Sequence, residues 1–262
     1  MARAAQNRPI GVIGNDEFGP AIAERIAACR VPVLYAALPG SPPAIYGEHL
    51  QPVTSAANDM SQCPVTLVAV EDTDAFRTLL TSQTAAAFDF APLSGSVLVD
   101  LGARTPRELD ALLGLLEPRG VSLTDAALIG GPEAAAEGRS KVLLGGAEAA
   151  VVIAESVVSL LGQVERTGPL GSAHAAAALM GYVEAAHAVA REEAMALGAA
   201  CGLTPEMVTR VLTERAGPHG LNVVQLARRA DLARRIARDR NGTADVIDLA
   251  TAKQERSKRE NR

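Results

Sequence analysis

The residues best suited to acid–base chemistry lie in one stretch, residues 172–201, which contains no proline and only two glycines. We expect this stretch to form a single long helix. Histidine titrates near neutral pH and is the commonest general base, so His174 is the predicted base. Glu184 falls on the same helical face by its three-and-four spacing, and Tyr182 and His187 fall on neighbouring faces. We predict catalytic roles for Tyr182 and Glu184, with Tyr182 orienting or protonating the substrate, and a substrate contact for His187.

Each of these side chains also has a structural interpretation. Glu184 would then be a buried hydrogen-bonding group, and the histidines would cap or bridge helices. Ala177 and Gly181 share the face of His174 and carry almost no side chain. We therefore expect both to line a substrate pocket whose floor is wide and apolar.

The elements that must position these residues follow a repeating order. Short apolar runs, expected to be buried strands, lie at 9–13, 31–37, 65–70, 96–101 and 121–124. Helical patterns alternate with them. Pro106 begins one helix at a position where its missing N–H is not needed. The alternation predicts an α/β fold with a Rossmann-like, doubly wound parallel sheet.

The pattern changes after Gly168, where strands give way to helices. We predict a Rossmann-like domain over residues 1–167 and an all-helical C-terminal domain over 168–240 that contains the long inter-domain helix. Residues 241–262 are polar and are expected to form a disordered tail.

Composition excludes several classes of function. The net charge of −5 argues against a nucleic-acid-binding protein, and the three scattered cysteines predict neither a disulfide framework nor a metal site. We see no signal peptide and no apolar run long enough to span a membrane. The expected protein is cytoplasmic, with a small molecule as its partner.

A glycine loop follows the first predicted strand, at Gly14-Asn15-Asp16-Glu17-Phe18-Gly19. Gly14 and Gly19 match the outer glycines of a dinucleotide fingerprint, but Asp16 replaces the middle one, which normally lets the backbone approach a pyrophosphate. A carboxylate about 4 Å from a phosphate costs roughly 4 kcal/mol at an effective dielectric of about 20. Asp16 would instead suit the helix start as a cap. If NAD(P) binds, we expect it to contact Gly14, Asp16, Phe18 and Gly19.

Further motifs give the chain a family resemblance over roughly residues 9–215. These motifs are Gly11-Val12-Ile13-Gly14, Val99-Asp100 with Pro106, Asp125-Ala126, Gly130-Gly131-Pro132, Gly145-Gly146 and Gly168-Pro169-Leu170-Gly171-Ser172. The chain thereby resembles the β-hydroxyacid dehydrogenase superfamily, which includes 3-hydroxyisobutyrate dehydrogenase, imine reductases and 6-phosphogluconate dehydrogenase. The resemblance implies a Rossmann-like domain and a helical domain that often forms the dimer, so we expect a homodimer through the helical domain.

The departures from the family fall on positions that the resemblance assigns to cofactor or substrate. The family's Ser-Thr pair reads Gly102-Ala103, its substrate-binding serine reads Ile129, its catalytic lysine reads Ala177 and its asparagine reads Gly181. The only lysines are Lys141, Lys253 and Lys258, none of them at the family's position.

These departures favour a cofactor-independent lyase on a dehydrogenase-like scaffold. Its general base would drive retro-aldol C–C cleavage that releases an aldehyde such as formaldehyde, or a related elimination, on a hydroxyl-bearing and preferably aromatic molecule. Arg104 is predicted to hold a substrate anion, with a salt bridge at a helix start as the alternative, and Ile129 is predicted to line the substrate site. One rival interpretation is an NAD(P)-dependent oxidoreductase, since imine reductases also lack the lysine. The other is a catalytically silent, dimerising subunit.

Overall fold

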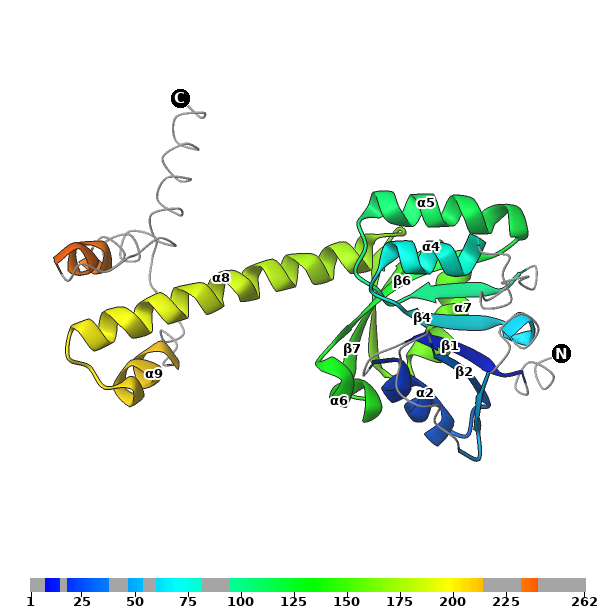
Figure 1. Ribbon diagram of the computed structural model, residues 1–262, viewed down its shortest axis with the longest axis horizontal. Helices are drawn as coiled ribbons and strands as arrows, with labels where there is room; N and C mark the ends of the chain where they lie inside the picture. Colours follow the sequence, from blue (N-terminus) through cyan, green and yellow to red (C-terminus); the bar gives the residue numbers. More distant parts are fainter. Residues whose placement is uncertain are drawn as a thin grey trace, which may run out of the picture. The chain divides into compact units, whose positions relative to one another are not determined.

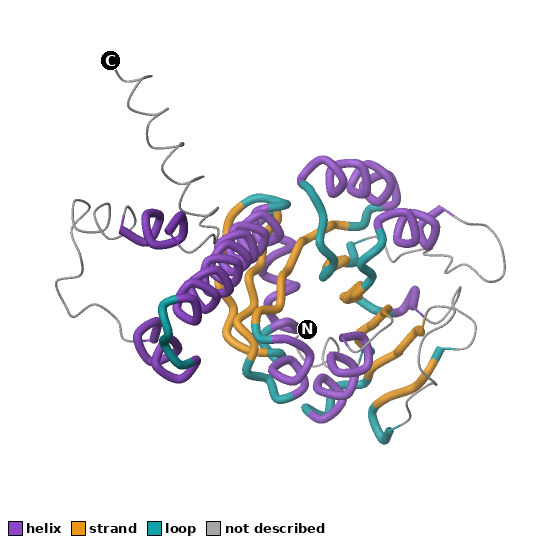
Figure 2. The backbone as a smooth tube through the Cα atoms, turned by 60° about the vertical axis from the view of Figure 1, so that its left-hand side comes forward, coloured by secondary structure: helices purple, strands orange, loops and turns teal. Residues whose placement is uncertain are grey.

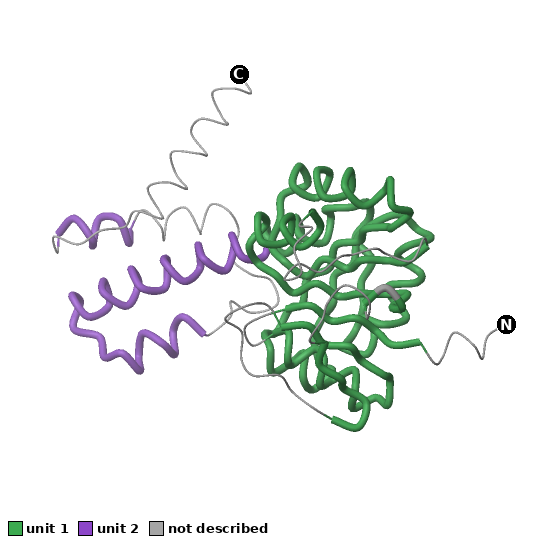
Figure 3. Tube along the Cα trace, turned by 45° about the vertical axis from the view of Figure 1, so that its right-hand side comes forward, with its two compact units in different colours: residues 1–179 green, residues 180–262 purple. Residues whose placement is uncertain are grey.

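The computed structural model describes residues 8–14, 18–37, 47–53, 60–81, 95–213 and 232–239 (Figure 1). By its internal contacts the chain divides into two compact units, residues 1–179 and 180–262 (Figure 3). Each unit is described by itself. The predicted domain boundary at residue 167 stays a prediction.

The first unit is built on one sheet of eight strands (Figure 2). In spatial order the strands are β3 (Leu50–Pro52), β2 (Val33–Ala37), β1 (Ile10–Gly14), β4 (Val65–Ala69), β5 (Val97–Asp100), β6 (Ser122–Ile129), β7 (Ser140–Gly146) and β8 (Gly162–Gly168). Neighbouring strands are parallel except for β6 and β7, which pair antiparallel. The predicted Rossmann-like α/β class is confirmed. Chain order reverses between β1 and β4, which is where ligands of such sheets bind.

Helices cover both faces of this sheet. On one face, α2 (Phe18–Ala28) and α7 (Glu148–Val158) pack into a core cluster with the strands, and Ile22 and Ile26 are fully buried there. On the other face lie α4 (Thr73–Thr81) and α5 (Pro106–Leu116), which lie together in Figure 1. Short apolar strands buried on both faces are typical of a parallel sheet between helical layers.

The start of α5 matches its sequence signal. Thr105 accepts a hydrogen bond from the backbone N–H of Glu108, the Glu108 carboxylate accepts one from the backbone N–H of Thr105, and Pro106 occupies the first helical position. This reciprocal capping box satisfies two N–H groups that the helix would otherwise leave open. Short helices that the sequence interpretation did not assign are α6 (Gly131–Ala136), η1 (Met60–Gln62) and η2 (Glu117–Arg119).

The second unit contains most of a long helix, α8 (Ser172–Ala200), which begins in the first unit. Its predicted end is confirmed, because Gly202 adopts a left-handed φ of 80° that disfavours other residues. Thr204 then caps α9 (Pro205–Thr213), accepting the N–H of Met207 at 3.3 Å. Residues 232–239 are helical, and the predicted tail at 241–262 lies outside the described residues. Among the described helices, none is long and apolar enough to cross a membrane.

Candidate active site

The first unit contains a cavity of about 620 Å³ at the carboxyl ends of its parallel strands. Its walls come from the start of α2, the segments after β4 and β5, the end of β6 and the first turns of α8. The lining residues are mainly apolar, and they include Phe18, Glu71, Gly102, Arg104, Ile129 and His174. A cavity of this size at the chain reversal is the usual ligand site of an open α/β sheet.

Gly14 and Gly19 bring the end of β1 and the start of α2 into direct contact beside this cavity. A side chain added at Gly14 would lie 3.0 Å from the Cα atom of Gly19 and 3.0 Å from the carbonyl oxygen of Ala69. One added at Gly19 would lie 3.0 Å from the carbonyl carbon of Gly14. Both outer glycines of the fingerprint therefore serve close packing of helix on strand. Asp16 lies outside the described residues.

Tyr35 contacts the end of β1 through its hydroxyl. Its side chain is buried, and its hydroxyl donates a hydrogen bond to the carbonyl oxygen of Gly14 at 3.1 Å. The carbonyl at the last residue of β1 is thus satisfied by a side chain from the neighbouring strand.

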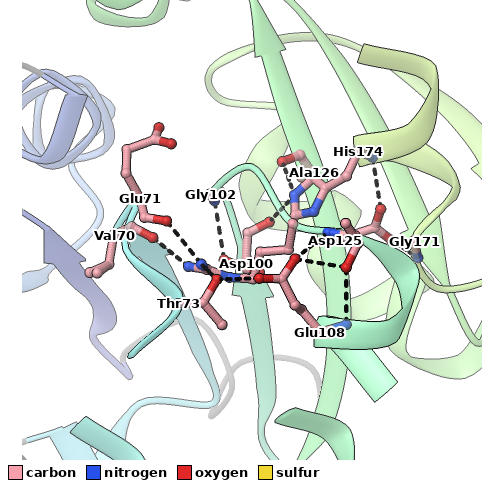
Figure 4. A network of polar contacts seen from close by, with 12 residues as sticks. Val70, Glu71, Thr73, Asp100, Gly102, Glu108, Asp125, Ala126, Gly171 and His174 are labelled. Carbon is pink, nitrogen blue, oxygen red and sulfur yellow. Dashed lines mark hydrogen bonds and ion pairs between the residues drawn. The ribbon is translucent and has the colours of Figure 1, made fainter. Parts of the chain in front are cut away.

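A buried ion pair underlies the cavity wall that follows β5 (Figure 4). The Arg104 Nε donates to the Asp100 carboxylate at 2.7 Å, and both side chains are 0% exposed. The N–H of Gly102 donates to the same carboxylate at 3.1 Å. Burial raises the pKa of the Asp100 carboxyl, and the adjacent Arg104 guanidinium opposes that rise.

His174 is buried in the wall where α8 begins. Its Nε2 lies 3.2 Å from the carbonyl oxygens of both Asp100 and Ala126, which only accept hydrogen bonds. In the neutral imidazole, Nε2 therefore carries the proton and Nδ1 is the acceptor. Nδ1 is buried and has no hydrogen-bond partner among the described residues. One ring nitrogen is thus held by two carbonyl oxygens, and the other has no hydrogen-bond partner among the described residues.

Asp125 fixes the first turn of α8 to the sheet (Figure 4). Its fully buried carboxylate accepts the N–H of Gly171 at 2.8 Å and the N–H of His174 at 2.9 Å. These contacts satisfy two N–H groups at the helix start, where the partial positive charge of the helix favours a carboxylate. Asp125 therefore determines where His174 lies.

The sequence-predicted site residues fall into two groups. The first lines the cavity of the first unit and consists of Phe18, Arg104, Ile129, His174 and Ala177. The second lies farther along α8 in the second unit, where its members are exposed, and consists of Gly181, Tyr182, Glu184 and His187. Tyr182, for example, is 73% exposed. The predicted catalytic and substrate-binding roles of both groups stay predictions.

The setting of Arg104 rules out one of its two sequence interpretations. It does not form a surface salt bridge, because its side chain is completely buried. Its role as a ligand for a substrate anion stays a prediction, and would require it to exchange one of its present partners.

Sequence reasoning missed Asp100 and Asp125 as anchors of the site. A signal for both was present, because Asp100 ends the apolar strand Val97–Asp100 and Asp125 lies inside the strand Ser122–Ile129. Aspartate is rarely buried without a partner, so each position predicts a donor nearby. Which donor it is depends on the tertiary structure.

Residues 9–171, more than half of the chain, match the family described as the NAD binding domain of 6-phosphogluconate dehydrogenase. Among curated proteins, L-threonate dehydrogenase of Cupriavidus necator is 30% identical over 171 residues, which are 63% of this chain and 56% of that protein. The mitochondrial 3-hydroxyisobutyrate dehydrogenase of Bos taurus is 25% identical over 81% of this chain and 63% of its own length. The chain thus spans between about half and two thirds of these two relatives.

Solved structures share the fold at lower identity. An imine reductase from Aspergillus terreus, in complex with NADPH4 and dibenz[c,e]azepine, has a TM-score of 0.80 at 16% identity, over 97% of this chain and 95% of its own. An imine reductase variant from Myxococcus stipitatus, in complex with NAD+, has a TM-score of 0.78 at 16% identity, over 97% and 94%.

These comparisons correct two expectations. The interpretation as a cofactor-independent lyase, and with it the expectation of no nicotinamide cofactor, is wrong, because the matching family is an NAD binding domain and the curated relatives are dehydrogenases. The error came from giving the replaced positions, Asp16 among them, more weight than the packing of Gly14 against Gly19, which survives. The chain belongs to the family of the NAD binding domain of 6-phosphogluconate dehydrogenase.

Proposed function

We propose that this protein is a nicotinamide-dependent oxidoreductase, a dehydrogenase or a reductase of a C=O or C=N bond. The observation that carries the proposal is the cavity of about 620 Å³ at the chain reversal of the sheet, beside the close contact between Gly14 and Gly19. The cofactor, when bound, donates or accepts the hydride, and the protein supplies binding, orientation and proton handling.

The residues of the first unit fit such a group. Among the described residues, α2 starts at Phe18 and its first turn carries no acidic residue, while Asp16 and Glu17 lie outside the described residues. A helix start of this kind binds phosphate. The close approach of Gly14 to Gly19 is the feature that a dinucleotide site requires of its turn. The pyrophosphate would lie at this helix start and the nicotinamide along the wall formed by residues 101–105.

Proton handling falls to His174 in this proposal. Among the described residues, the cavity lining contains no lysine, and it includes an imidazole whose Nδ1 is buried without a hydrogen-bond partner. Nδ1 can accept a proton from a substrate hydroxyl or amine while Nε2 stays fixed by the carbonyl oxygens of Asp100 and Ala126. Tyr182, Glu184 and His187 lie in the second unit, and their roles stay predictions.

The character of the wall points to the kind of substrate. Leu101, Ala103, Leu128 and Ile129 line the cavity, and the guanidinium of Arg104, which also lines it, is already paired with Asp100. We propose a substrate with an apolar body next to its reacting carbon, in preference to a small polyhydroxy acid.

Titration with NADH and with NADPH, followed by nicotinamide fluorescence, tests the proposed function. We expect saturable binding of at least one nucleotide, and absence of binding up to about 1 mM would refute the proposal. Gly19→Ala should weaken binding on the order of tenfold, because the new methyl group would displace the turn. Gly114→Ala is the matched control, since a side chain there meets nothing within 4 Å.

We also propose that α8 associates with a second copy of the chain. Along α8, Leu179, Tyr182 and Val189 are large, apolar or aromatic, and between 49% and 73% exposed. Exposed apolar side chains in such a row mark protein interfaces. Light scattering coupled to size exclusion should give the mass of a dimer. A monomer at all concentrations would contradict this proposal.

A further inference from the structure

The guanidinium of Arg104 connects two loops that border the cavity. Besides its ion pair with Asp100 at the end of β5, Nη1 donates to the carbonyl oxygen of Glu71 at 3.1 Å and to the hydroxyl of Thr73 at 3.1 Å. Nη2 donates to the carbonyl oxygen of Val70. All of the latter partners follow β4. Arg104 therefore fastens the segment after β4 to the segment after β5.

The ring of Phe76 completes the enclosure of this cation. The Arg104 Cζ lies 4.9 Å from the centroid of the ring, within the range of a cation–π contact. The donors thus face acceptors and the guanidinium faces an aromatic ring. A group enclosed in this way is held in place and is not free to follow a ligand.

Gly102 is the position that makes room for the guanidinium. A side chain added there would lie 2.6 Å from Nη2 and 2.9 Å from Cζ of Arg104, and 2.7 Å from the carbonyl oxygen of Val70. The φ of Gly102 is not in the left-handed region, so backbone conformation does not demand glycine there. Space does, and the space is taken by the guanidinium of Arg104 and the carbonyl oxygen of Val70 to which it donates.

We propose that Arg104 is a positioning residue, a strut that sets the spacing between the ends of β4 and β5, and that glycine at 102 is the condition for it. Both fastened segments line the cavity, through Glu71 on one side and residues 101–105 on the other. The strut therefore fixes the wall against which the nicotinamide would lie, and this last step rests on the proposed function. The pairing also explains why a glycine stands at 102, where the resembled family has a serine.

Hydrogen exchange of the nucleotide-free protein tests the strut directly. Arg104→Met keeps the length of the side chain and removes its donors. It should speed amide exchange together in residues 69–73 and 101–105, by about tenfold or more. Arg119→Met is the control. Arg119 lies in η2, beyond the far end of α5, and donates to the carbonyl oxygen of Leu80 in α4. Faster exchange in only one of the two segments, or in neither, would overturn the proposal.

A double-mutant cycle tests the condition at residue 102. Gly102→Ala should weaken nucleotide binding by about tenfold in the native background and by about threefold or less in an Arg104→Ala background, where the contacts with Nη2 and Cζ are gone and only the one with the carbonyl oxygen of Val70 remains. The same penalty in both backgrounds would refute the coupling. Should the native chain bind neither nucleotide, the proposed function fails. The coupling between residues 102 and 104 is then measured by thermal unfolding of the same four variants. Hydrogen exchange still tests whether Arg104 holds the two segments together.

Discussion

Replacing Asp125 by asparagine isolates the contribution of one carboxylate to the position of α8. The native side chain is fully buried and accepts the N–H groups of Gly171 and His174 at 2.8 and 2.9 Å. Asparagine has nearly the same shape, but only its oxygen can accept. Its NH₂ group would face the second N–H, donor against donor.

The expected cost follows from these two contacts. Losing one hydrogen bond to a charged acceptor costs about 1.5–3 kcal/mol, and leaving a buried N–H unsatisfied costs about 1–3 kcal/mol. The two costs describe one event and partly overlap, so we expect a loss of about 2–4 kcal/mol in the free energy of unfolding. For a chain of this size, this loss corresponds to a decrease in Tm of about 5–15 °C.

Thermal and urea unfolding followed by circular dichroism measure this loss. Asp110→Asn is the matched control, since Asp110 is exposed on α5 and should change stability by less than about 0.5 kcal/mol. If the two variants lose the same small amount, Asp125 does not cap α8 and the account of how His174 is placed is wrong.

Three further predictions concern single contacts. Tyr35→Phe removes the hydroxyl that donates to Gly14, so unfolding in urea should show a loss of about 1 kcal/mol. Phe76→Ala empties a fully buried site and should cost about 3–5 kcal/mol by the same measurement; a loss below about 1 kcal/mol would contradict the packing described. Hydrogen bonds from Thr105 lower the pKa of Glu108, so the stability that its carboxylate gives is complete above its ordinary pKa and is lost as pH falls through the lowered value. The stability difference between the native chain and Glu108→Gln should therefore shrink from about pH 6 to about pH 3, and a difference that is constant with pH would refute it.

Local signals were enough for much of the fold. Thr105 and Pro106 predict the start of α5, and Gly202 predicts the end of α8, because each acts through its own backbone and the adjacent turn. Buried strands such as Val65–Ala69 read as continuous apolar runs, since both of their faces are covered. The helix α7 was not predicted, because its sequence EAAVVIAESVV combines alanines with a β-branched run and fits a buried helix or a strand equally well.

The candidate site depended far more on tertiary structure. Strand β6 continues to Ile129, five residues beyond the predicted end, because its second half pairs antiparallel with β7. That pairing carries Ile129 into the cavity wall. The residues that pair with this second half lie in β7, outside residues 121–129, so the local sequence could not predict the extension.

By itself, the sequence determined the α/β class, the alternation of strands and helices, the glycine turn and the long helix, because each is set by residues within a turn or two of one another. The tertiary structure decided what the polar residues do. Arg104 meets Val70 and Glu71 more than thirty positions away in the chain, and His174 meets Asp100 at a separation of 74. The sheet brings these segments to one edge, and burial there removes water as a competing partner, so the identity of each partner depends on the folded arrangement and not on spacing along the chain.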